Sequence, residues 1–226
     1  MLVAAAVCPC PPLLVPAVAA GAAPELDAAR AACADALGVL AAARPDRLIV
    51  VGPAGENARG PHLEGAVGSF RGFGADVDVV LGGRAAGGQE RKAAAPEVSP
   101  AASLPASLAV GAWLLEHVHW SAAPVGGLGV GEPLAAERCV RSGQQLAGRP
   151  ERLALLIMGD ASACRTVKAP GYLDERAAGF DAEVARALGA ADVAALKALD
   201  AELAYELKAA GRAPWQVLAG AAEGAG

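Results

Sequence analysis

The sequence predicts an α/β fold with a mostly parallel central sheet, flanking helices and a helical C-terminal third. Three short apolar runs, at residues 2–7, 48–51 and 153–158, each stop abruptly at Gly, Pro or a polar residue. Such runs are typical of strands that helices cover on both faces. Segments with helical periodicity separate the runs, which favours βαβ units. The 226 residues suit one domain, residues 1–226, with a sizeable core.

The first part of the chain alternates between strand and helix. After the strand at residues 2–7, three prolines in residues 11–16 predict an extended connection. A helix is expected from Pro24, because apolar residues up to Leu40 share one stripe, which places Cys33 in the core. The next strand covers residues 47–51.

The middle of the chain is rich in glycine. Residues 55–75 show little periodicity and predict a loop over the strand ends. Residues 76–81 alternate between polar and apolar, which suits a half-exposed antiparallel or edge strand. Residues 82–103, rich in Ala, Gly and Pro, predict a long mobile loop.

The second half returns to regular elements. We expect a helix at residues 105–117, a glycine-rich strand at 124–130 and an amphipathic helix at 134–146 that buries Cys139. The strand at residues 153–158 follows. Three helical pieces, at residues 173–188, 191–207 and from about Pro214, complete the chain.

Composition argues against two classes of partner. The net charge is −5 and Lys and Arg are not clustered, which is unsuited to nucleic acid; residues 84–92 are expected to form a solvated loop. No stretch approaches the ~20 apolar residues of a membrane span. Prolines interrupt the apolar N-terminus and no Lys or Arg precedes Arg30, which argues against a secretory signal. Five cysteines, an odd number, favour reduced thiols, and we expect a cytoplasmic protein.

Functional residues are expected where the strands end, because ligands bind beyond the carboxyl ends of strands in open α/β sheets. At the first end, Cys8 and Cys10 face the same side, with Pro11 beside them. This Cys-x-Cys pair could bind a soft metal or form a redox pair, with Cys164 as the nearest further candidate partner. Inert, buried thiols are the favoured alternative.

The other two strand ends carry more polar groups. Pro53, Ala54 and Glu56 follow the second strand, and His62 is the one imidazole near these segments. Glu56 and His62 are candidate ligands or bases, against the alternative of solvated loop residues.

The third end is the richest in polar groups. Asp160 follows the strand directly and is a candidate site residue as well as a turn former. Ser162 and Ala163 come next, and Arg165 could hold an anion or form a surface ion pair.

Taken together, these segments resemble the B-subunit-like superfamily of class III extradiol ring-cleavage dioxygenases, with its Memo-like relatives and its alanine-rich actinobacterial branch. Residues 10–16 (Cys-Pro-Pro-Leu-Leu-Val-Pro) are similar to the family's His-Pro-Pro-Leu-hydrophobic-Val-Pro. Residues 48–54 match the run that leads to Ser-Pro-His, and residues 159–163 (Gly-Asp-Ala-Ser-Ala) match Gly-Asp-Leu-Ser-His. A helix with Phe180 and Asp181 follows as in the family, and residues 215–221 are similar to its closing helix, here with Trp215.

The resemblance implies an Fe(II) site of two histidines and one carboxylate, with a further histidine as acid and base. The first metal histidine corresponds to Cys10, the second to Ala54 and the acid/base histidine to Ala163, while the carboxylate falls near Gly211 or Arg212. Alanine neither binds metal nor moves protons. The family's iron ligands are therefore not retained, and a metal would need replacements such as Cys10, Glu56 or His62.

Two functions remain open on this evidence. The first is a dioxygenase-like protein with a degenerate iron site that lacks ordinary ring cleavage, in which Asp160 and His62 are the catalytic candidates. The second is a non-catalytic member that binds a small molecule or a protein at the strand ends. Cys10, Pro11, Pro53, Ala54, Glu56, Ser162, Ala163, Arg165 and Trp215 would line the pocket. A homo-oligomer that uses Trp113, Trp120 or Trp215 is also open, although core burial is favoured for each.

Overall fold

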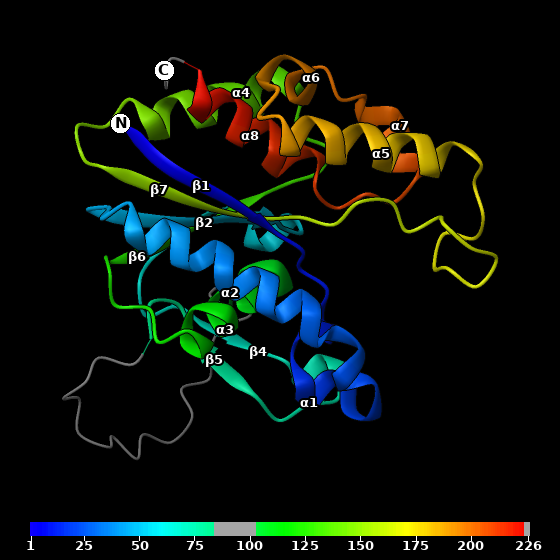
Figure 1. Ribbon diagram of the computed structural model, residues 1–226, viewed down its shortest axis with the longest axis horizontal. Coiled ribbons are helices and arrows are strands. Elements are labelled where there is room, and N and C mark those ends of the chain that lie inside the picture. The colour runs from blue at the N-terminus through cyan, green and yellow to red at the C-terminus, as the bar shows by residue number, and fades with distance from the viewer. Residues whose placement is uncertain (84–102, 224–226) are drawn as a thin grey trace.

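The computed structural model describes residues 1–83 and 103–223, and it confirms the α/β prediction (Figure 1). The central sheet contains β1 (Leu2–Cys8), β2 (Arg47–Pro53), β3 (Gly60–His62), β6 (Val125–Val130) and β7 (Leu153–Met158). The strand order is β1-β7-β2-β6-β3. The first four strands in this order are parallel neighbours, and β3 pairs antiparallel with β6 at one edge.

The apolar runs form central strands because both of their faces are covered. All six residues of β7 are buried. Alternate side chains enter two separate cores, so that Leu156 lies in one core and Leu155 in the other. The sheet therefore divides the molecule into two helical layers.

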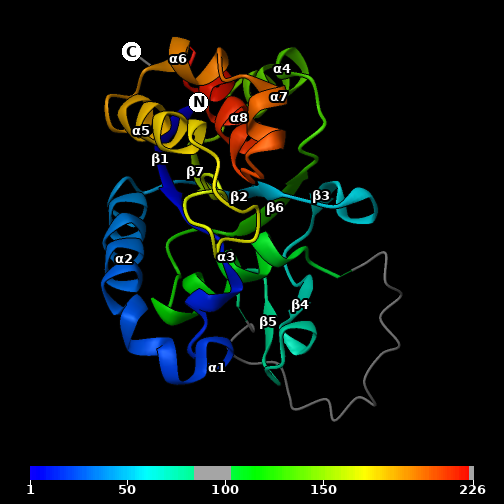
Figure 2. The same ribbon diagram turned by 90° about the vertical axis from the view of Figure 1, so that its right-hand side faces the viewer.

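The first layer contains α2 (Asp27–Ala42) and α3 (Ala106–His117), with a small antiparallel pair of β4 (Val67–Ser69) and β5 (Asp78–Val80) (Figure 2). Cys33 lies in this core, as predicted. The expectation of an extended segment at residues 11–16 is wrong. Residues 12–14 and 20–26 form 3-10 turns and α1 covers Pro16–Ala19, because proline is well suited to the first position of a helical turn.

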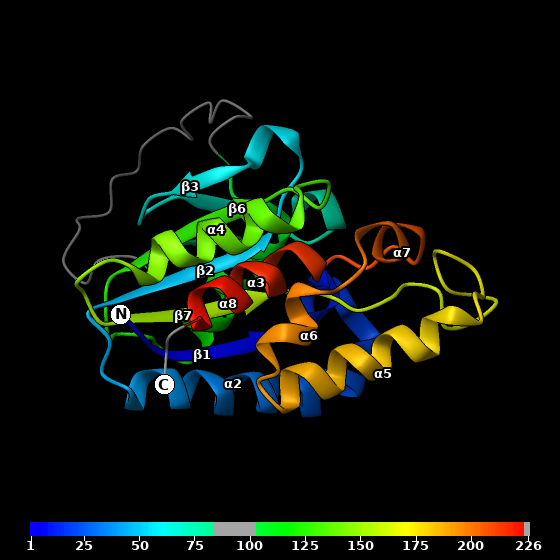
Figure 3. The same ribbon diagram turned by 90° about the horizontal axis from the view of Figure 1, so that it is seen from above.

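The second layer contains α4 (Ala136–Ala147), α5 (Arg176–Gly189), α6 (Val193–Lys197), α7 (Ala201–Glu206) and α8 (Arg212–Ala222). Helices α4 and α8 lie side by side over the sheet (Figure 3). Glycine at positions 143 and 220 permits their close approach. A Cβ on Gly143 would collide with the Val217 carbonyl, and a Cβ on Gly220 would collide with Val140. Cys139 is buried in this layer, as predicted.

One predicted helix, residues 191–207, is divided into α6 and α7. The side chain of Asp192 accepts a hydrogen bond from the backbone N–H of Ala195. Asp200 likewise accepts from the N–H groups of Glu202 and Leu203. Each aspartate therefore caps a new helix, and the caps override the helical periodicity that runs through both segments.

The glycine-rich middle holds more structure than its sequence indicates. Residues 55–75, expected to be a loop, contain β3 and β4, since pairing with β6 and β5 supplies their backbone hydrogen bonds. The strand predicted at residues 76–81 is confirmed as β5. The expected loop at 82–103, with its basic segment 84–92, falls almost entirely outside the described residues.

The described residues also bear on the expected partners. All five cysteines are free and buried. Trp215 is buried and Trp113 and Trp120 are half-buried. Across residues 1–83 and 103–223, no helix combines the length and the apolar character that a membrane span requires.

Candidate functional site

Four adjacent strand ends meet at one edge of the sheet. Cys10 follows β1, Asp160 follows β7, Ala54 follows β2 and Glu132 follows β6. The register pairs Cys8 with Met158, so the chain brings Cys10 and Asp160 level just beyond the strands. These residues lie beyond the carboxyl ends of the strands, which is where ligands bind in open α/β sheets.

Cys10 and Asp160 are in direct contact. The Cys10 backbone N–H donates to Asp160 Oδ1 at 2.9 Å, and its thiol donates to Oδ2 at 3.5 Å. Burial, and next the nearby Asp160 charge, raise the pKa of Cys10 well above its usual value. Burial also raises the pKa of Asp160, against the opposing effect of the two Cys10 donors. Cys10 is therefore a protonated hydrogen-bond donor and not a reactive thiolate.

The backbone of Asp160 attaches the C-terminal segment to this edge. The Ala210 N–H donates to the Asp160 carbonyl at 3.0 Å, and the Asp160 N–H donates to the Ala210 carbonyl at 3.4 Å. The Ala163 N–H likewise donates to the Leu207 carbonyl at 3.0 Å. These bonds place the first turn of α8 over the end of β7.

Trp215, predicted to line a pocket, is instead packed into this corner. It is only 1% exposed, and its ring lies against Gly159 and Gly211. A Cβ on Gly211 would collide with the indole, so glycine is required there for space. The indole Nε1 has no hydrogen-bond partner among the described residues.

Glu132 and Arg212 form the second polar pair of the site. Arg212 is 2% exposed, and it donates to the Leu134 carbonyl at 2.7 Å and to Gln216 Oε1 at 2.9 Å. Its Nε lies 3.9 Å from Glu132 Oε2. Burial raises the pKa of Glu132 to about 7, and this effect outweighs the opposing charge of Arg212 and the Ala213 N–H. Glu132 is therefore suited to exchange a proton near neutral pH.

Sequence reasoning missed Glu132 and Gln216, and it treated Arg212 only as a lost carboxylate. Glu132 stands between Gly131 and Pro133, a pattern typical of an exposed turn. The signal that could have found it is positional, because Glu132 follows a predicted strand in the same way that Asp160 does.

Three buried polar atoms lack a hydrogen-bond partner in the described part of the chain. They are Glu132 Oε1, Arg212 Nε and Trp215 Nε1. Glu132 and Arg212 pair where the end of β6 meets the first turn of α8, whereas the Trp215 indole lies beside Gly159 at the end of β7. An unsatisfied buried polar group costs about 1–3 kcal/mol. The three atoms are two N–H donors and one carboxyl oxygen, so satisfying all of them requires both acceptor and donor groups.

The proposed replacement metal ligands do not come together. Glu56 is exposed in a 3-10 turn, Glu56–Ala58. His62 lies on β3 and pairs with Gly127 of β6, and its Nε2 lies 2.9 Å from the Ala58 carbonyl. Within residues 1–83 and 103–223, no group of three or more His, Cys, Asp or Glu side chains is placed to hold a metal ion. The residues present therefore do not fit an Fe(II) site.

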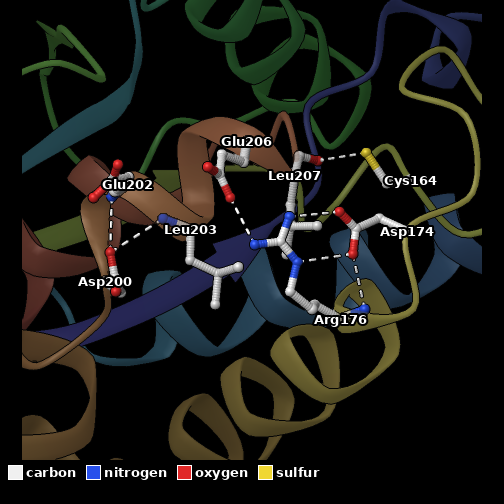
Figure 4. A network of polar contacts seen from close by, with 8 residues as sticks. All are labelled: Cys164, Asp174, Arg176, Asp200, Glu202, Leu203, Glu206 and Leu207. Carbon is white, nitrogen blue, oxygen red and sulfur yellow. Dashed lines mark hydrogen bonds and ion pairs between the residues drawn. The ribbon is translucent and has the colours of Figure 1, made fainter.

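Cys164 does not join Cys10 either. Cys10 lies in the core that contains α2 and α3, whereas Cys164 lies in the opposite core. The Cys164 thiol donates to the Leu207 carbonyl at 3.3 Å, beside the ion pairs that link Arg176 to Asp174 and Glu206 (Figure 4). Its position stabilises the connection between β7 and α5.

Ser162 and Arg165 are held by Asp181 of α5. The Asp181 carboxylate accepts from the Ser162 N–H at 2.9 Å, from the Ser162 hydroxyl at 3.0 Å and from Arg165 at 3.0 Å. Arg165 was expected either to hold an anion or to form a surface ion pair, and in the structure it forms the ion pair with Asp181. The motif that resembles Gly-Asp-Leu-Ser-His is thus fastened at both ends, by Asp160 and by Ser162.

The remaining predicted residues have mainly structural contacts. Pro11 and Pro53 offer carbonyls, which accept from the Leu14 N–H at 2.9 Å and from the Ser107 hydroxyl at 2.6 Å. The Ala54 N–H donates to the Val130 carbonyl at 2.8 Å and fixes the end of β2 against β6. The Ala163 carbonyl accepts from the Gly171 N–H at 2.9 Å.

Comparisons with protein-family models and with curated proteins find no match to this chain. The site is therefore defined by its geometry, which consists of a thiol–carboxylate pair just beyond the ends of β1 and β7 and an acid–arginine pair between the residue after β6 and the first turn of α8.

Proposed function

We propose that this protein is a class III extradiol dioxygenase-like protein with a degenerate iron site, which does not carry out ordinary aromatic ring cleavage. The observation that carries the proposal is the hydrogen bond between the Cys10 thiol and Asp160, at the position where the resemblance puts the first iron ligand. A protonated thiol is a poor ligand, because metals bind the thiolate.

The other positions support the same conclusion. Ala54 and Ala163 offer only methyl groups where the family has histidines. Arg212, a cation, occupies the neighbourhood of the family's carboxylate and is bonded to Leu134 and Gln216. A buried guanidinium repels a divalent ion.

Iron loading tests this proposal. The protein is incubated anaerobically with Fe(II), desalted, analysed for iron, and assayed with catechol and oxygen for a ring-opened product. We expect iron far below one per chain and no product. Stoichiometric iron that disappears in Cys10→Ala or His62→Ala, or catechol cleavage above the metal-only background, would overturn the proposal.

The second candidate is a non-catalytic protein that binds a small molecule at the strand ends. The three unpartnered polar atoms of Glu132, Arg212 and Trp215 favour it, because they would pair with a ligand that carries both a donor and an acceptor. The proposal includes a cytoplasmic location, because free thiols are typical of a reducing compartment.

The indole N–H signals in an NMR spectrum provide a test with an internal control. Titration with small amides and hydroxy acids should shift the Trp215 signal. The Trp120 signal should stay unchanged, because its Nε1 already donates to the Ala123 carbonyl at 2.9 Å. Loss of the response in Glu132→Gln would support the corner as the binding site, and no selective response to any compound would argue against this candidate.

A further inference from the structure

A cavity of about 290 Å³ lies between β6, α4 and the turn that precedes β3. Leu128, Val130, Pro133 and Leu134 form apolar walls, and Arg59 and Ser142 contribute polar groups. Cys10, Asp160 and Arg212 do not line it, so this cavity is independent of the proposed function.

Glycines at the end of β6 allow Arg59 to reach the cavity. A Cβ on Gly131 would collide with Arg59 Nε, so the guanidinium lies directly on bare backbone. A Cβ on Gly129 would in the same way collide with the Ala58 carbonyl. Gly60, with φ of +107°, turns the chain from this contact into β3.

The charged side chain among the residues that line this cavity is that of Arg59, in a chain whose net charge is −5. Within the described residues, Arg59 has no ion-pair partner, in contrast to Arg71, Arg176 and Arg186, which each contact two carboxylates. Arg138, one turn before Ser142 on α4, also has no such partner there. Arg59 is therefore a cation available to a ligand.

We propose that this cavity binds a small carboxylate with an apolar body. A guanidinium pairs with a carboxylate through two parallel hydrogen bonds. Apolar walls with one charged group are typical of small-molecule sites, and 290 Å³ is at the small end of their range. Leu128 and Val130 would contact the apolar body while Arg59 holds the anionic group. Among the described residues Arg59 is the one cation that lines the cavity, which favours a monoanion over a phosphate.

Benzoate is a suitable probe, and calorimetric or NMR titration measures its binding. We expect benzoate to bind, while benzamide, of the same shape without charge, and inorganic phosphate, without an apolar body, bind at least about tenfold more weakly. Arg59→Met should weaken benzoate binding by about tenfold or more. Gly131→Ala should do the same, because its methyl group displaces the retained guanidinium.

Arg141→Met is the matched control. It removes the same charge from an exposed position of α4 that does not line the cavity, and benzoate binding should be unchanged. Circular dichroism of each variant checks that the fold is retained. The proposal is overturned if about 10 mM benzoate fails to bind, if Arg59→Met binds as the wild type does, or if benzamide or phosphate binds as tightly as benzoate.

Discussion

The carboxylate of Asp160 accepts two hydrogen bonds from Cys10, which lies 150 positions earlier in the chain. This contact joins the end of β1 to the end of β7. Together with burial, which is the larger effect, the nearby Asp160 charge also raises the pKa of the Cys10 thiol. The contact thus bears both on the stability of this edge of the sheet and on the low reactivity of its thiol, and substitutions can test each.

Asp160→Ala should lower the free energy of unfolding by about 1–3 kcal/mol, because the Cys10 N–H loses its acceptor in a largely buried place. Urea denaturation measures the change. Asp160→Asn is the control, since its amide oxygen can still accept from that N–H and the loss should be smaller. Equal losses in the two variants would show that the hydrogen bond does not stabilise the site.

The raised pKa of Glu132 predicts an unusual dependence of stability on pH. Its folded pKa of about 7 exceeds the ordinary value of 4.5, so the fold favours the protonated acid. This contribution is complete below pH 4.5 and is lost as the pH rises toward 7, by at most about 3 kcal/mol. In Glu132→Gln the free energy of unfolding should lack this decline between pH 4.5 and 7. A parallel pH profile in wild type and variant would contradict the assignment.

Arg212→Met should destabilise the protein by about 3–5 kcal/mol, because it leaves the Leu134 carbonyl and Glu132 without their buried cation. Arg165→Met removes an exposed ion pair with Asp181 and should cost only about 0–1 kcal/mol. Chemical denaturation compares the two. The Arg212 variant should also raise the pKa of Glu132 further, which a carboxyl NMR titration can detect.

Gly211→Ala should destabilise the protein by about 1–3 kcal/mol, because its Cβ collides with the Trp215 ring. The fluorescence of Trp215 should change with it. Gly179→Ala, in α5, is the matched control, since a Cβ there meets nothing within 4 Å. That substitution should be stabilising by up to about 1 kcal/mol. A neutral Gly211→Ala would show that the corner of β7 and α8 is loosely packed.

All five cysteines should react slowly with a thiol reagent in the native state and fully in denaturant, because each is buried. Contact with Cys33 and burial raise the pKa of Cys8, and burial raises the pKa of Cys10. Both shifts lower the thiolate fraction further. A single fast-reacting thiol in the native protein, lost in Cys10→Ala, would contradict this and reopen a chemical role for Cys10.

The strands and most helices could be predicted because their signals are local. An apolar run such as residues 153–158 identifies a buried strand wherever it lies in the sheet. The failures have two causes, long-range pairing and a local cap. Residues 60–62 carry no periodicity and become β3 only through pairing with β6, and Asp200 starts a helix where the pattern alone predicts continuation.

The candidate site could be predicted only in outline. The ends of parallel strands were expected to meet, and Cys10 and Asp160 do so. Glu56 and His62, in contrast, were candidates because of their residue type alone. Glu56 lies exposed in a 3-10 turn, and His62 pairs with Gly127 of β6 in the antiparallel edge strand β3.

Local patterns in the chain were sufficient to define most of its strands and helices, because apolar periodicity is a relation between neighbouring residues. Which partners they meet depends on long-range packing. Strand β7 inserts between β1 and β2, and α8 brings Arg212 to Glu132, across 80 residues of chain. Hydrogen bonds and charges between such distant residues leave no periodic trace in the sequence, so the chemistry of this site follows from the fold.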